Sequence, residues 1–282
     1  MNMTLRNLYY LLTVLLLVGT SPPAAADARS DALAQQRKAA EAYVQLREAF
    51  RRSNEVEPLR RELEAVDAEL ALSTQALQGL NLHAEVAAGL LWRARVANLL
   101  VDDDLAARRF VEAAKAAQQA GDAAHQASAW AGKARLEMQR KQPALALEDA
   151  RRAIALAPAS GSADAQSTAL GVLVAVLAER RELVAARDAS VRQFAAAALA
   201  EDPIHRYLAY FSRLSMHMQD ITDCDPMGDI VPCLQAHDAA IADLDAANAS
   251  ATKLGYRALA RRSSDLRALY ANTRALIERR GP

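Results

Sequence analysis

The chain has 282 residues, of which 34 are basic and 34 acidic, so its formal net charge is zero. This balance argues against a nucleic-acid partner or an anionic membrane surface, which both call for an excess of basic residues. Aromatic residues make up only 5% of the chain, while Ala and Leu dominate the apolar class. Because Ala and Leu favour helices, and sheets need β-branched and aromatic residues, the composition predicts helices throughout.

Residues 1–26 have the layout of a cleaved secretory signal peptide. An apolar run from Leu8 to Val18 follows a single basic residue, and Ala24 and Ala26 form an A-x-A cleavage site before Asp27. The run is much shorter than the roughly 20 residues that a membrane-spanning helix needs. We therefore expect cleavage after Ala26 and a periplasmic or secreted mature chain without a transmembrane segment; an uncleaved anchor is the alternative.

Residues 27–83 are expected to form a helical cap. Ser30 is a favoured N-cap residue for a first helix that ends near Arg52. Pro58 is placed to begin a second helix, which carries Leu and Val at alternating spacings of four and three residues and ends near Gly79. We interpret this apolar stripe as a packing seam within the chain, because a coiled-coil dimer, the alternative, needs a longer run of heptads.

Three similar helix pairs are expected over residues 84–200. Segments in the second helix of each pair share a pattern of small residues: Asp104 to Gly121, Ala144 to Pro158 and Glu182 to Ala200. Two registers run through these segments, Ala106, Ala146 and Ala185 in one, and Phe110, Ala150 and Ala189 in the other. One helix pair cannot bury its own apolar face, so this period of about 40 residues predicts pairs that stack against their neighbours.

The central pair resembles a tetratricopeptide repeat. That pattern has a large apolar residue, a small one four positions later, another twelve after that, another seven later and a proline five beyond; here these are Trp130, Ala134, Ala146, Ala153 and Pro158. The chain departs from the pattern at Lys133, Glu137 and Ala150, where the family has Leu, Tyr and Phe, and its period exceeds the family's value of about 34. The resemblance implies an all-α fold, a right-handed α-solenoid of stacked helix-turn-helix pairs.

The resemblance also implies a concave groove lined by the first helix of each pair. Its groove positions correspond to Arg95 and Asn98 in one pair and to Arg135, Met138 and Gln139 in the next, whereas Val174 takes the arginine position in the third. Arginines one repeat apart suit a carboxylate or an extended peptide, although solvated surface arginines are the alternative interpretation. We therefore expect a scaffold or adaptor that binds a protein or peptide partner, as a monomer or weak oligomer.

The C-terminal region, residues 201–282, is expected to contain further helical pairs and a disulfide loop. Cys224 and Cys233 are the two cysteines of the chain. In an exported protein a lone pair at this spacing predicts one disulfide, which would clamp the turn between two helices. A redox-active pair is less consistent with the sequence, because active pairs usually have C-x-x-C spacing beside a strand.

Two metal-site hypotheses near this loop fail on ligand type or geometry. A calcium-loop template matches Asp223, Asp225, Gly228 and Asp229, but Met227 and Leu234 occupy positions that need oxygen ligands. A soft-metal site could use Met216, His217, Met218, Met227 and His237. On a helix, however, side chains two residues apart point in different directions. We predict no metal and no cofactor, and keep a ligand-sensing or soft-metal-sensing module as the alternative function.

Catalysis has little support in the sequence. The chain lacks a nucleophile elbow, a zinc-protease helix motif, a P-loop and a glycine-rich dinucleotide turn. Its five histidines are scattered singly, and the acidic run Asp102 to Asp104 is placed to begin a helix, where the helix dipole favours negative charge. We therefore do not predict an enzyme.

Overall fold

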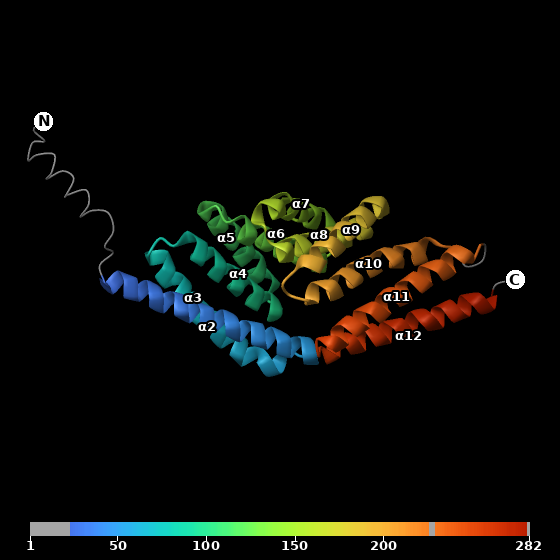
Figure 1. The fold of residues 1–282 in the computed structure, drawn as a ribbon, viewed down its shortest axis with the longest axis horizontal. Coiled ribbons are helices and arrows are strands. Elements are labelled where there is room, and N and C mark those ends of the chain that lie inside the picture. The colour runs from blue at the N-terminus through green and yellow to red at the C-terminus, as the bar shows by residue number, and fades with distance from the viewer. Residues whose placement is uncertain (1–22, 226–228, 281–282) are drawn as a thin grey trace, which may run out of the picture.

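The computed structural model describes residues 23–225 and 229–280, and the regular elements in these ranges are helices. In these ranges eleven α-helices and one short 3-10 helix follow one another (Figure 1). The all-α fold expected from the composition is thus confirmed. Within the same ranges, no helix combines the length and the apolar character needed to cross a bilayer.

The N-terminal helices pack against each other along an apolar seam. Helix α2 (Pro23–Ser53) contacts α3 (Arg60–Gly79), and the leucine stripe of α3 is buried within the chain, as predicted. Two expected helix starts are wrong. Helix α2 begins before Ser30, so the expected cleavage position lies in its first turn, and Pro58 belongs to the 3-10 helix η1 (Glu57–Leu59), which precedes α3.

Three helix pairs then follow with a constant period. Their first helices are α4 (His83–Leu99), α6 (Ala123–Gln139) and α8 (Ala163–Glu179), and their second helices are α5 (Asp103–Ala120), α7 (Pro143–Ser160) and α9 (Leu183–Leu199). Equivalent helices begin 40 residues apart in every case. The expected stack of helix-turn-helix pairs with a 40-residue period is therefore confirmed.

The turns between these helices repeat every 20 residues. The residue just after each helix end has a left-handed backbone with φ between 56° and 69°: Asn81, Val101, Gly121, Lys141, Gly161 and Arg181. At several of these turns the next residue donates its N–H to the carbonyl five positions back, as Asp102 does to Ala97 at 3.0 Å. This is a Schellman turn, which satisfies carbonyls left free at the helix end. Val101 is β-branched, a residue type that rarely adopts positive φ, so the stacked helices fix this geometry against local preference.

The constant period corrects the register expected for the third pair. Ala186, which is fully buried, is equivalent to Ala146, whereas Ala185 is exposed. The predicted register was therefore one residue short. The same shift places the buried amide of Gln193 at the position that Ala153 holds in the second pair, where its Nε2 donates to Ser212 Oγ at 3.2 Å.

Two of the departures from the tetratricopeptide pattern, Lys133 and Glu137, form an ionic cluster with Asp149. Lys133 Nζ lies 3.1 Å from Glu137 Oε1 in the same helix and 2.6 Å from Asp149 Oδ2 in α7. Both carboxylates are buried. Burial lowers the pKa of Lys133, but its hydrogen bonds to Asp149 and Glu137 outweigh this effect and raise the pKa overall. The lysine therefore remains charged and holds α6 against α7.

The positions equivalent to Lys133, Glu137 and Asp149 hold different residues in the two neighbouring pairs. In the preceding pair, Arg109 donates to both oxygens of Asp67, each at 2.9 Å, and Arg93 donates to the same carboxylate at 3.2 Å. In the third pair, Leu173, Leu177 and Ala189 hold the positions of the lysine cluster. Equivalent positions are thus ionic in the first two pairs and apolar in the third.

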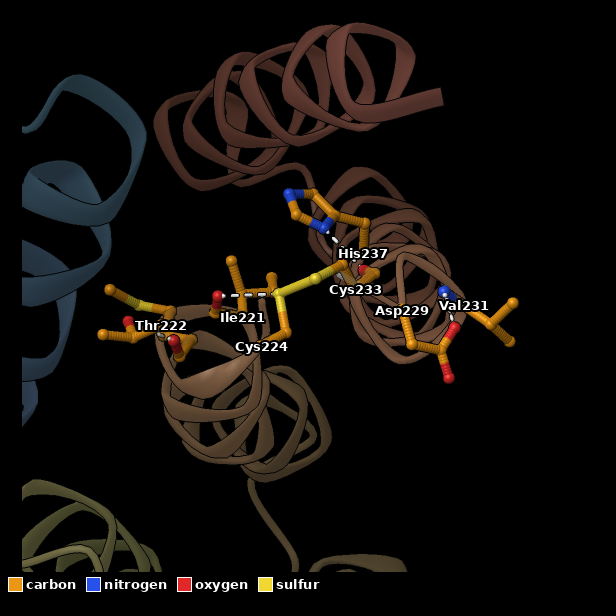
Figure 2. The surroundings of a disulfide bond; sticks show 8 residues. Ile221, Thr222, Cys224, Asp229, Val231, Cys233 and His237 are labelled. Atoms are coloured by element: carbon orange, nitrogen blue, oxygen red, sulfur yellow. Dashed lines mark hydrogen bonds between the residues drawn. A yellow bond between two sulfur atoms is a disulfide. The ribbon is translucent and has the colours of Figure 1, made fainter. Parts of the chain in front are cut away.

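The C-terminal helices extend the row and carry the predicted disulfide. Helix α10 (Ile204–Asp223) packs on α8 and α9, and it is followed by α11 (Val231–Lys253) and α12 (Arg257–Arg280). The disulfide between Cys224 and Cys233 is confirmed, with Cα atoms 5.3 Å apart. Figure 2 shows it joining the end of α10 to the first turn of α11, where Cys233 is fully buried.

The two ends of the row meet. Helices α4, α6, α8 and α10 contact one another in sequence as an inner layer, while α5, α7 and α9 lie outside them. In Figure 1 the blue end of α2 reaches the red corner between α11 and α12, and α2 contacts α12. Arg51 of α2 lies over the ring of Tyr256 in this corner, 5.5 Å from its centroid. Helix α2 therefore lies opposite the inner layer, on the other side of the concave face.

The lysine cluster generates a stability prediction. Replacing Lys133→Leu leaves the buried Glu137 without a cation and Asp149 with only the exposed Arg152, 3.3 Å away, so we expect the free energy of unfolding to fall by about 3 kcal/mol. The triple variant Lys133→Leu/Glu137→Leu/Asp149→Ala copies the third pair and is expected to recover most of this loss. Urea unfolding followed by circular dichroism measures both, with Lys115→Leu on the exposed face of α5 as control. A triple variant no more stable than the single one would contradict the interpretation.

Candidate functional site

A hollow of about 450 Å³ lies on the inner face of the row. Helices α2, α4, α6, α8 and α10 all contribute side chains to its wall. The charged side chains and imidazoles that line it are Arg47, Arg51, Arg95, Arg135, His125, His205, Asp164 and Asp202. We call it the arginine hollow. Its volume lies within the range of about 300 to 1,000 Å³ that is usual for ligand pockets.

Three of the five predicted groove residues line the arginine hollow. Arg95 and Asn98 of α4 and Arg135 of α6 lie in its wall. Met138 of α6 lines an adjoining cavity. Gln139 is exposed in the last turn of α6 and lines neither. The corrected register also changes the third pair. With a period of 40 residues, the position equivalent to Arg95 and Arg135 is held by Ala175 and not by the predicted Val174.

Arg95 and Arg135 bring positive charge to the hollow without a paired carboxylate. In the described part of the chain neither guanidinium makes an ion pair or a hydrogen bond, and Arg95 instead stacks on Trp92, 4.6 Å from the ring centroid. Burial lowers the pKa of Arg95; Tyr43 opposes this shift, and the charges of Arg47 and Arg135 add to it. Two guanidiniums that line one hollow without a paired carboxylate favour an anionic guest.

The opposite wall is held in place by a second pair of arginines. Arg47 and Arg51 of α2 lie 3.2 and 3.8 Å from Asp202 Oδ2, and Arg51 also pairs with Glu48 at 2.7 Å. Asp202 precedes α10 and accepts the backbone N–H of Ile204 at 3.0 Å. These contacts join residues 155 positions apart and fix α2 against the start of α10. Charge in this wall is balanced, unlike that of Arg95 and Arg135.

His205 is the buried imidazole of the hollow. Its Nε2 lies 3.4 Å from Asp164 Oδ1, and its buried Nδ1 has no hydrogen-bond partner among the described residues. Burial lowers the pKa of His205; Asp164 and Asp202 act in the opposite direction, while Arg135 and Arg51 add to the lowering. No described hydroxyl or thiol is hydrogen-bonded to the ring. The geometry thus offers a hydrogen bond to a guest and no activated nucleophile.

Close packing shapes the floor of the hollow. Gly132 of α6 faces the ring of Phe110 from α5, and a Cβ atom at Gly132 would lie 2.3 Å from Phe110 Cε1. Any larger residue would push the aromatic ring out of its place in the wall. Glycine is required here by close approach and not by its backbone angles.

An apolar cavity of about 440 Å³ adjoins the arginine hollow. Arg135, Thr168 and Leu208 line both spaces, so the two are direct neighbours. Met138 and Phe211 are among the apolar side chains that surround the second space. A guest that carries an anionic group beside an apolar one would contact both.

The remaining sequence hypotheses concern metals. The described residues contain no group of three or more His, Cys, Asp or Glu placed to hold an ion. Met216 is buried in the core whereas Met218 is half exposed, so the two thioethers diverge, as the helix geometry predicts. His217 lies 3.1 Å from Asp243 Oδ2, and His237 Nδ1 lies 2.8 Å from the Cys233 carbonyl. Met227 and Gly228 lie outside the described residues.

His217 belongs to a structural cluster around the buried carboxylate of Asp243. Arg213 of α10 donates through Nε to Asp243 Oδ2 at 2.7 Å and pairs with the same buried carboxylate through a second nitrogen. Burial raises the pKa of Asp243, but hydrogen bonds from His217 and Arg213 outweigh it and lower the pKa overall. This cluster joins α10 to α11.

Sequence reasoning missed Arg47, Arg51, Asp202 and His205. Their only local signal is that Arg47 and Arg51 stand four residues apart and so share a face of one helix. The other two lie after the last repeat, more than 150 residues away in the chain. Only the closing of the curve brings them to the hollow.

His205 generates a pH prediction. In the unfolded chain the imidazole of His205 has the ordinary pKa of 6.5, whereas burial lowers its pKa in the folded protein. Between the two pKa values the unfolded state binds more protons, so the free energy of unfolding should decrease as pH falls below about 6.5. In His205→Gln this decrease should be smaller, and in the exposed His83→Gln it should be unchanged. Urea unfolding at several pH values measures the slopes; equal slopes in all three proteins would contradict the assignment.

Comparisons with known proteins bear on the fold. No protein-family model and no curated protein matches the chain. Among solved structures, the Rap protein complexed with Competence and Sporulation Factor has a similar fold, with a TM-score of 0.52 and 14% identity, covering 86% of this chain and 66% of that one. This chain therefore spans just under two thirds of that protein. BtubC (BKLC) from P. vanneervenii gives a TM-score of 0.49 and 14% identity over 75% of this chain and 91% of its own. Together with the helix order, the first likeness shows a helical-repeat, tetratricopeptide-like fold.

Proposed function

We propose that this protein is an exported helical-repeat scaffold or adaptor that binds an acidic segment of a protein or peptide partner in the arginine hollow. One observation carries the proposal: Arg95 and Arg135, from successive repeats, line one hollow and have no carboxylate partner in the described chain. A carboxylate accepts two parallel hydrogen bonds from a guanidinium, so either arginine can bind an acidic side chain or a chain end.

The surroundings of the arginines favour a peptide over a free ion. Asn98 offers an amide on the same wall that can hydrogen-bond a peptide backbone. The adjoining apolar cavity gives space for a neighbouring side chain. The Rap protein, which has a similar fold, is complexed with Competence and Sporulation Factor, which supports a binding role for a curved row of this kind.

Export is part of the proposal and rests on separate features. Residues 1–26 have the layout of a signal peptide, and the disulfide between Cys224 and Cys233 suits an oxidising compartment. The bond closes a short loop between α10 and α11, where it would stabilise the fold by about 2 to 3 kcal/mol.

The binding proposal is tested by reversing charge at both arginines. Arg95→Glu/Arg135→Glu should abolish capture of partners from a periplasmic extract, because two carboxylates would then face an acidic segment. The thermal midpoint should remain nearly unchanged, since neither arginine holds an ion pair in the fold. The control is Arg108→Glu/Arg151→Glu, which makes the same charge change at exposed, unpaired arginines of α5 and α7. Equal capture by the hollow variant and the native chain would refute the proposal.

Export is tested by the mass of the protein recovered from the periplasm. We expect a chain that begins at Asp27 and has lost two hydrogens to the disulfide. Replacing both cysteines by Ser should lower the free energy of unfolding by about 2 to 3 kcal/mol. A full-length chain with two free thiols, found only in the cytoplasm, would contradict this part of the proposal.

A further inference from the structure

The outer face of α9 exposes larger apolar side chains than the equivalent positions of the other outer helices do. Val184, Val191 and Leu199 are 84%, 71% and 78% exposed, although large apolar side chains are usually buried. One period earlier the same positions hold Ala144, Arg151 and Ala159, and two periods earlier Asp104, Val111 and Gln119. Only the third pair thus presents three large apolar side chains at these positions.

These residues form a single stripe. Spacings of seven and eight residues bring Val184, Val191 and Leu199 within one side of an α-helix, and the exposed Ala195 lies between the last two. We call these four residues the α9 stripe. It is not part of the arginine hollow, whose lining includes no residue of α9.

A cavity opens beside one end of the α9 stripe. It has a volume of about 240 Å³, and Ala195 and Leu199 line it together with Ile154 and Pro158 of α7 and Leu170 of α8. The other end of the stripe carries Val184, its most exposed side chain. The stripe therefore has a projecting apolar group at one end and an apolar recess at the other.

We infer that the α9 stripe is the contact between two copies of this chain, related by a twofold axis near Val191. In such a contact the same surface serves both partners. With the two α9 helices antiparallel, Val184 of each copy lies opposite Leu199 of the other, beside its recess. The projecting group and the recess are about 22 Å apart along the helix, and the twofold axis makes both contacts at once.

Charge favours the antiparallel arrangement of the two copies. Asp188 and Arg192 flank the centre of the stripe and lie 3.9 Å apart, 75% and 55% exposed. In the antiparallel pairing, Asp188 faces the turn of the second copy that carries Ala195 and Arg192. A parallel pairing would place each Asp188 beside its own equivalent, and like charges in contact are unfavourable. The same axis also brings the two Arg192 residues beside each other, so the antiparallel pairing has two contacts between unlike charges against one between like charges, whereas the parallel pairing has only contacts between like charges.

The test uses sedimentation velocity of the mature chain over a range of concentrations. We expect a reversible dimer whose dissociation constant rises about tenfold or more in Val191→Asp and in Leu199→Glu. Leu72→Glu, at an exposed leucine of α3, should leave it unchanged. Circular dichroism midpoints show that each variant is folded. A chain that is monomeric at about 100 µM, or a dimer that neither stripe variant weakens, would overturn the inference.

Exchanging the two charges tests the orientation of the copies. Asp188→Arg alone should weaken the dimer because it brings two arginines together, and Asp188→Arg/Arg192→Asp should restore it because each copy keeps complementary charges. A double variant as weak as the single one would exclude the antiparallel pairing. The hollow variant Arg95→Glu/Arg135→Glu should dimerise normally, so failure of this inference and failure of the proposed function are separate results.

Discussion

Helices of 17 or 18 residues joined by turns at a constant interval are the constraint on which the rest of the structure depends. Six left-handed residues at 20-residue intervals, from Asn81 to Arg181, follow the ends of successive helices. Because the turns are alike, each pair is placed on the previous one by the same rotation and shift. Fully buried alanines such as Ala106, Ala146 and Ala186 let the helices approach closely at each step. Residues 40 positions apart therefore occupy equivalent places in the row.

This equivalence explains both the core and the candidate site. At one position of the frame the chain uses Arg109 against Asp67, and one period later Asp149 against Lys133, so charge appears with opposite sign in equivalent places. At another position it places Arg95 and Arg135 on the inner wall. The first set is paired and holds helices together, whereas the second is unpaired. The difference between paired and unpaired charge separates residues that serve the fold from those available to a partner.

Much of the fold followed from the sequence because the information is local and repeated. The tetratricopeptide-like spacing from Trp130 to Pro158 belongs to one helix pair, and similarity one period away predicted its neighbours. The third register was one residue short because alanines occur at both 185 and 186, and residue type alone does not distinguish them. The turn at Arg181, whose geometry equals that at Lys141, decides the register.

The candidate site was only half predictable for a related reason. Arg95, Asn98 and Arg135 could be predicted from the repeat pattern. Asp202 and His205 lie just before and at the start of α10 and line the hollow because α10 packs near α2 and α8, and no repeated signal in the sequence indicates this. The wall they form depends on closure of the whole curve. Long-range contacts of this kind are set by the summed rotation of all the pairs, which no single segment encodes.

Fluorescence quenching of Trp92 tests the central claim that Arg95 and Arg135 share one positively charged hollow. The chain has two tryptophans, so Trp130→Phe leaves Trp92 as the single reporter on the wall. The account predicts that iodide quenches Trp92 more strongly than caesium, and that Arg135→Gln, 43 residues from Trp92 in the sequence, reduces the iodide effect. Equal quenching by the two ions, or no response to Arg135→Gln, would contradict it.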